Sequence, residues 1–160
     1  PADRADEMAT LRRWSPLPLI ADESFAGESG GALDGLASGF HGVNIKLMKT
    51  GGLSNAIKVA DISGVYGIEC MIGCMLESSI GVAAAAHIAA AKSTVITKVD
   101  LDTPSLGEYD PVTSGVQFDG AEIVITDAPG LGITAIEGLE GGRDDLASRG
   151  EQDGRIQGRG

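Results

Sequence analysis

The chain has 160 residues, 42% of them hydrophobic, and carries 23 acidic against 12 basic side chains, a formal net charge of −11. The length fits one domain or a piece of a larger one, and the apolar share excludes wholesale disorder. The acidic balance excludes a nucleic-acid phosphate binder and a polybasic membrane anchor, which both need a basic face. No apolar run reaches the roughly 18 residues that span a bilayer. Two cysteines, Cys70 and Cys74, are no disulfide framework, so we expect a cytoplasmic protein.

Apolar patterning predicts helices that alternate with short, apolar strands. The predicted helices cover residues 3–13, 29–38, 53–66 and 78–92. The predicted strands cover residues 17–21, 43–46, 68–72 and 96–100. Alternation at a period of about 25 residues indicates βα units, so the predicted fold class is α/β with a parallel sheet.

The pattern changes after Pro104. Residues 116–118 and 122–126 are predicted to be two short strands joined by Asp119-Gly120, a hairpin turn signal. Residues 134–160 are rich in Gly, Arg and Asp, and we expect a disordered tail there, which leaves residues 1–133 as the folded part.

Polar side chains sit where each predicted strand ends. In chain order these candidate site residues are Asp22, Lys46, Cys74, Glu77, Asp100 and Asp102. In a β/α barrel the active site lies at the carboxyl ends of the strands, so these side chains would ring one mouth. The alternative is that loops of any α/β protein are polar.

Several segments resemble one known family in order and at fitting spacings. They are Pro18-Leu19-Ile20-Ala21-Asp22-Glu23-Ser24, Asn44-Ile45-Lys46-Leu47-Met48-Lys49-Thr50-Gly51-Gly52, Met71-Ile72-Gly73-Cys74-Met75-Leu76-Glu77-Ser78, Lys98-Val99-Asp100-Leu101-Asp102-Thr103-Pro104 and Pro129-Gly130-Leu131-Gly132-Ile133. The first resembles the metal-ligand motif of the enolase superfamily, in its muconate-lactonizing subgroup. The second is similar to the base-bearing strand of that subgroup, and the fourth to the Asp-x-Asp segment of its dipeptide epimerases.

The resemblance implies a (β/α)₇β barrel with a capping domain, a Mg²⁺ ion held by three carboxylates, and one lysine on each face of the substrate. Asp22 inherits the role of a metal ligand, and Lys46 that of acid and base on one face. Asp100 and Asp102 would hold the ammonium group of a dipeptide, with Cys74 and Glu77 lining the pocket. The chemistry is consistent, because proton removal beside a carboxylate builds an enediolate whose charge a hard divalent ion stabilises.

The sequence also departs from the family pattern. A Lys-x-Lys strand and two of the three metal ligands are missing, so we expect the C-terminal part of a racemase or epimerase, truncated at its N-terminal side. Such a chain would be inactive and barely stable by itself, with two open strand edges and an exposed apolar inner layer. Muconate cycloisomerase, o-succinylbenzoate synthase and a non-catalytic α/β interaction module remain alternatives, and a homo-oligomeric parent is left open.

Individual residues also have other interpretations. Glu23 is the alternative to Asp22 as ligand, because neighbouring residues of a strand point to opposite faces. Lys49 is expected to be solvated, although it could orient the loop that carries Lys46. We expect strand packing rather than metal binding for Cys70 and Cys74. His41 precedes a strand, away from the strand ends, and is expected to have a structural role.

Overall fold

The structure is a computed structural model that describes residues 5–25 and 38–138. Its main sheet has four strands in chain order, and every neighbouring pair is parallel. The strands are β1 (Ile20–Ala21), β2 (Gly42–Lys46), β3 (Glu69–Gly73) and β4 (Ile96–Asp100). The predicted α/β class and parallel sheet are confirmed. β1 is shorter than predicted, because Pro16 and Pro18 lack the amide hydrogen that a strand ladder needs.

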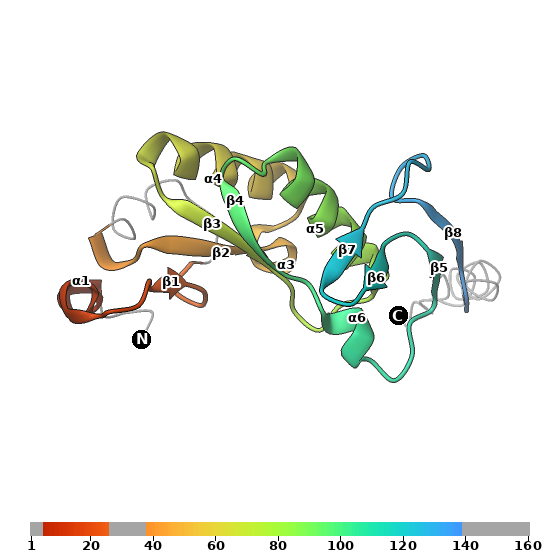
Figure 1. Ribbon diagram of the computed structural model, residues 1–160, viewed down its shortest axis with the longest axis horizontal. Coiled ribbons are helices and arrows are strands. Elements are labelled where there is room, and N and C mark those ends of the chain that lie inside the picture. The colour runs from red at the N-terminus through yellow and green to blue at the C-terminus, as the bar shows by residue number, and fades with distance from the viewer. Residues whose placement is uncertain (1–4, 26–37, 139–160) are drawn as a thin grey trace, which may run out of the picture.

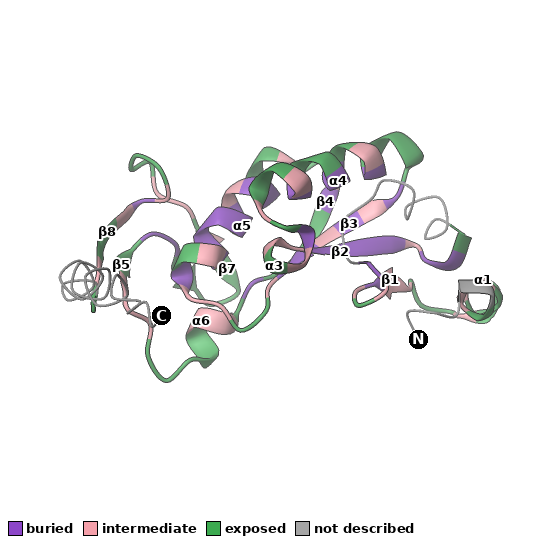
Figure 2. Ribbon diagram, turned by 180° about the vertical axis from the view of Figure 1, so that it is seen from behind, coloured by how far each residue is buried: buried purple, intermediate pink, exposed green. Residues whose placement is uncertain are grey.

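Two long helices cover one face of this sheet (Figure 1). They are α4 (Leu53–Tyr66) and α5 (Ser79–Ala91), which contact each other and the strands beneath them. The sheet side chains that face the helices, Val43, Ile45, Cys70 and Ile72, are fully buried. Figure 2 shows the buried residues along β2 and on α5. The alanines of α5 let it approach the sheet closely, and this face is the hydrophobic core.

The other face of the sheet is more polar than the sequence predicted. Residues at alternate positions share a face, so Asn44 and Lys46 lie there together, as do Glu69 and Lys98. Lys98 Nζ is 2.5 Å from Glu69 Oε1, an ion pair near the amino ends of the strands. The prediction of an exposed apolar inner layer is therefore wrong for the described residues.

Short helices fill positions that the sequence pattern missed. α3 (Leu47–Thr50) follows β2 without a loop and ends at Gly51, whose φ of 76° is in the left-handed region. α6 (Thr103–Leu106) follows β4. The first predicted helix is α1 (Ala5–Trp14), whereas most of the helix predicted over residues 29–38 lies outside the described residues. No helix within the described ranges has the length and apolar character of a membrane span.

The C-terminal part forms two small antiparallel pairs. The predicted hairpin is present as β6 (Gln117–Asp119) and β7 (Glu122–Val124). Its turn is Gly120–Ala121, one residue later than predicted, with Gly120 at a φ of 59°. β5 (Val112–Ser114) pairs with β8 (Ile133–Ile136), and all of β8 except Ile133 lies inside the range 134–160 that was assigned to a tail. That boundary is corrected, and residues 139–160 lie outside the described part.

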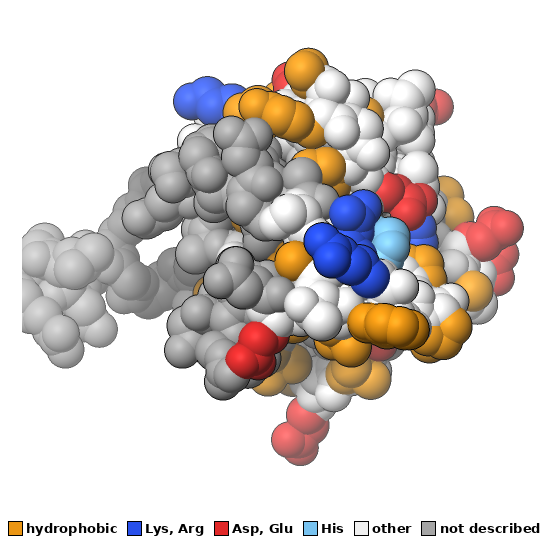
Figure 3. Space-filling view, turned by 90° about the vertical axis from the view of Figure 1, so that its left-hand side faces the viewer, with side chains coloured by type: hydrophobic (Ala, Val, Ile, Leu, Met, Phe, Trp, Pro, Cys, Tyr) orange, Lys and Arg blue, Asp and Glu red, His pale blue; other side chains and the backbone are white. Residues whose placement is uncertain are grey.

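A hollow of about 420 Å³ lies at the end of the molecule near α1, away from the carboxyl ends of the strands. Arg12, Arg13 and His41 are among its lining residues. Figure 3 shows Lys and Arg side chains gathered beside a histidine on this face. His41 has the structural role expected of it, because its Nδ1 accepts a hydrogen bond of 3.0 Å from the Leu19 amide.

Candidate active site

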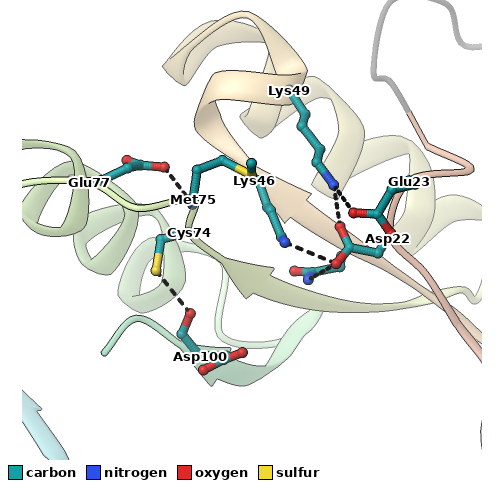
Figure 4. Close-up of polar contacts among 9 residues, drawn as sticks. Asp22, Glu23, Lys46, Lys49, Cys74, Met75, Glu77 and Asp100 are labelled. Carbon is teal, nitrogen blue, oxygen red and sulfur yellow. Dashed lines mark hydrogen bonds and ion pairs between the residues drawn. The ribbon is translucent and has the colours of Figure 1, made fainter. Parts of the chain in front are cut away.

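Two lysines bracket the carboxylate of Asp22 (Figure 4). Lys46 Nζ is 2.9 Å from Asp22 Oδ2, and Lys49 Nζ donates to Oδ1 at 2.5 Å. Asp22 directly follows β1, and Lys46 is the last residue of β2, so parallel pairing brings both to the same edge of the sheet. The structure thus brings together two of the residues that the sequence singled out.

Lys49 is not the solvated side chain that the sequence predicted. Its Nζ also donates to Glu23 Oε1 at 2.9 Å, and its side chain is 19% exposed. The α3 helix begins directly after Lys46, and this places Lys49 one turn later, above Asp22. Glu23 is 78% exposed and contacts Lys49, whereas Asp22 contacts both lysines. Asp22 is therefore the better placed of the two carboxylates to act with Lys46.

The two lysines change the acidity of the cluster. Burial alone raises the pKa of Asp22, but hydrogen bonds from Lys49 and Lys46 outweigh it and leave that pKa below its ordinary value of 3.8. The hydrogen bond from Lys49 likewise lowers the pKa of Glu23. Burial alone lowers the pKa of Lys49, but its bonds to Asp22 and Glu23 leave it above the ordinary 10.5. At neutral pH Lys49 is therefore a fixed cation against Asp22.

A second group of contacts joins the loops that follow β3 and β4. Thr103 Oγ1 donates to Cys74 Sγ at 3.3 Å, and it also contacts the backbone of Glu77. Cys74 Sγ donates to the Asp100 carbonyl at 3.5 Å. The Glu77 carboxylate accepts the Met75 amide at 2.9 Å (Figure 4). Glu77 therefore bonds within its own loop.

Asp100 and Asp102 lie at the same edge of the sheet but form a separate group. Gly73 pairs with both Lys46 and Asp100, so these residues share one row across three strands. Asp102 directly precedes α6, without a capping hydrogen bond from its side chain. Both aspartates line a hollow of about 670 Å³ between α5, β4 and the β6–β7 hairpin. Among the described residues, no ion pair or hydrogen bond joins either carboxylate to Lys46.

The residues fit only part of a magnesium site. Asp22 offers hard carboxylate oxygen, the donor that Mg²⁺ prefers. In residues 5–25 and 38–138, however, no three His, Cys, Asp or Glu side chains converge as a metal-binding group. The described part of the chain therefore offers one candidate ligand, Asp22, and not a complete site.

Other residues at this edge were missed by sequence reasoning. Asp110 accepts both the amide and the hydroxyl of Ser79 at the start of α5. This contact spans 31 residues, so no local pattern signals it. Asn44 contacts Asp22 through its amide. The only sign of this role in the sequence is that Asn44 is a polar residue inside an otherwise apolar strand. Cys70 is fully buried in the core, as predicted.

The arrangement, with polar side chains at the carboxyl ends of parallel strands, is that of a β/α-barrel enzyme site. The sequence profile of the enolase C-terminal domain-like family matches residues 1–138. The chain therefore belongs to the enolase C-terminal domain-like family.

Several relatives are dipeptide epimerases, and one is an N-succinyl-L-Arg/Lys racemase. The L-Ala-D/L-Glu epimerase of Clostridium acetobutylicum is 48% identical over 120 residues, which are 75% of this chain and 33% of that protein. The substrate-liganded L-Ala-D/L-Glu epimerase of Bacillus subtilis superposes with a TM-score of 0.78 at 33% identity, covering 85% of this chain and 38% of that one. The dipeptide epimerase of Cytophaga hutchinsonii, complexed with Mg and D-Ala-L-Val, gives 0.78 at 27% identity, covering 87% and 38%. The chain spans about a third of the length of the curated relatives it matches.

Proposed function

We propose that the chain provides the Asp22–Lys46 edge of a Mg²⁺-dependent dipeptide epimerase, an isomerase of amino acid derivatives. The observation that carries this proposal is the 2.9 Å contact between Lys46 Nζ and Asp22 at the carboxyl ends of adjacent parallel strands. The names of the relatives, two L-Ala-D/L-Glu epimerases among them, support the substrate class.

Lys46 is the acid and base on one face of the substrate. As the free amine it removes the proton from the carbon beside the substrate carboxylate, and the bond electrons move into an enediolate. As the ammonium ion it returns a proton to that carbon in the reverse direction. Lys49, fixed on Asp22 and Glu23, is not free to take this part. The acid and base of the opposite face is not assigned to a described residue.

Asp22 would be one Mg²⁺ ligand. When bound, the ion stabilises the negative charge that develops on the carboxylate oxygens. Asp100 and Asp102 would bind the ammonium group of the dipeptide, as their similarity to the Asp-x-Asp segment of the dipeptide epimerases implies. Cys74, whose Sγ donates to the Asp100 carbonyl, would lie beside them in the substrate site, and Glu77 would shape its loop.

The test is to graft residues 1–138 in place of the corresponding third of the Clostridium acetobutylicum epimerase. We expect the graft to epimerise L-Ala-L-Glu with Mg²⁺ and to lose this activity in EDTA. An N-acetylated dipeptide, which lacks the ammonium group, should be a poor substrate, and Asp100→Asn should raise KM for the free dipeptide. A graft that matches the parent in circular dichroism and size but has no activity would refute the proposal.

A further inference from the structure

Asn44 is a buried polar side chain in the middle of β2. It is 6% exposed, and its neighbours Val43 and Ile45 are fully buried on the helix side. Its Oδ1 is buried and has no hydrogen-bond partner among the described residues. Asn is a poor strand former, and an unpaired buried acceptor lowers stability. An apolar residue would therefore suit this position better if stability were its only role.

The amide of Asn44 contacts the candidate site directly. Its Nδ2 donates to Asp22 Oδ2 at 3.4 Å, the same oxygen that Lys46 Nζ contacts at 2.9 Å. Asn44 and Lys46 are two residues apart on one strand, so both side chains lie on the same face. The ionised carboxylate only accepts hydrogen bonds, which fixes the amide nitrogen as the atom that faces Asp22.

Gly73 leaves the space that the Asn44 amide occupies. A Cβ on Gly73 would lie 2.7 Å from Asn44 Oδ1 and 2.9 Å from Nδ2, both too close for real atoms. The φ of Gly73 is not positive, so the backbone itself does not require glycine here. Gly73 also pairs with Lys46 in the ladder, which places this gap beside the base.

We propose that Asn44 is a positioning residue, which holds the Asp22 carboxylate in the orientation that meets Lys46, and that Gly73 is small to admit its amide. This inference rests on the proposed function. The polar side chain of Asn44 lowers the stability of β2, but it holds the Asp22 carboxylate in a fixed geometry beside Lys46. Small displacements of such groups reduce turnover strongly while substrate binding changes little.

The first test uses the 160-residue chain and the variant Asn44→Leu, which keeps the branching at Cγ and removes both polar atoms. Because the variant also removes an unpaired acceptor, its unfolding equilibrium constant should change by less than about threefold. Ser63→Ala is the control, a fully buried polar residue of α4 on the helix side of the sheet. A loss of more than about thirtyfold in Asn44→Leu would indicate a merely structural role and overturn the inference.

The second test measures kinetics in the epimerase graft. Asn44→Leu should lower kcat by about 10- to 100-fold and leave KM within about twofold. Gly73→Ala, which displaces the amide, should give the same division between kcat and KM, and the double variant should be no worse than either single one. Ser63→Ala should leave both parameters unchanged. An unchanged kcat in Asn44→Leu would overturn the inference.

The two proposals fail in different ways. If the unsubstituted graft is folded but inactive, the proposed function is wrong. The contact between Asn44 and Asp22 is then decided on the 160-residue chain, by combining Asn44→Leu with Asp22→Asn. A coupling of at least about threefold in the unfolding constant supports the positioning contact, and simple additivity overturns it.

Discussion

Replacing Asp22 with Asn tests the electrostatics of the candidate site. The substitution keeps the shape of the side chain but removes the charge that Lys46 and Lys49 share. At an effective dielectric constant of about 20, a charge pair 2.9 Å apart has a gross attraction of about 6 kcal/mol. The side chains of Asp22 and Lys46 are 32% and 14% exposed, so solvent screens part of it. We therefore expect Asp22→Asn to lower the free energy of unfolding by about 2 kcal/mol, a value between those for exposed and for buried ion pairs.

The pH dependence gives this prediction a sign. The pKa of Asp22 in the folded chain lies below its ordinary value of 3.8, so the folded state favours the ionised form. The stabilisation is therefore complete above the unfolded pKa and is lost as the pH falls through the folded pKa. The difference between the unsubstituted chain and Asp22→Asn should be constant near pH 7 and should shrink below about pH 4.

The assay is urea unfolding of the 160-residue chain, followed by far-ultraviolet circular dichroism at several pH values. Asp61→Asn is the matched control, because Asp61 pairs with Lys92 at 2.6 Å but its side chain is 58% exposed. The control should cost less than about 1 kcal/mol. The reasoning is refuted if both variants cost the same, or if the cost of Asp22→Asn does not change on acidification.

Two further predictions concern the sheet edge and the metal. Gly42→Ala should destabilise the chain by about 2 kcal/mol, because the new Cβ would lie 2.6 Å from the Glu69 carbonyl oxygen and 2.8 Å from Ile20 Cδ1. The control in the same unfolding assay is Gly107→Ala, which should be nearly neutral because the nearest atom to its Cβ is 3.7 Å away. Calorimetric titration of the 160-residue chain with millimolar Mg²⁺ should give no saturable binding, because Asp22 supplies one carboxylate and Lys49 already occupies it; a tight, stoichiometric site in the chain alone would contradict this.

The parallel sheet could be predicted because its strands are short apolar runs at a regular spacing. Residues 43–46, 68–72 and 96–100 were found within a residue of β2, β3 and β4. The pairing of β5 with β8 could not be predicted, since it joins strands of three and four residues whose nearest paired residues, Ser114 and Ile133, are 19 positions apart. Such short segments carry too few alternating residues to indicate their partners.

The proximity of Asp22 and Lys46 could be predicted, because position along a strand decides it. Other contacts at this edge were missed, because they depend on a local detail of three-dimensional structure. Lys49 meets Asp22 only because α3 starts directly after β2, and nothing in the charge pattern names that partner. The Glu77 carboxylate turns to the Met75 amide, which depends on the shape of one loop. Proposed roles in substrate binding for Asp100 and Asp102 remain predictions.

The central claim is that Lys46 exchanges the substrate α-proton on one face. The measurement is deuterium incorporation from heavy water into each epimer of the dipeptide, catalysed by the graft carrying Lys46→Ala, with Lys92→Ala as the control lysine. We predict that one epimer loses exchange by about 100-fold or more while the other still exchanges, because only one face has lost its base. Undiminished exchange from both epimers would contradict the account.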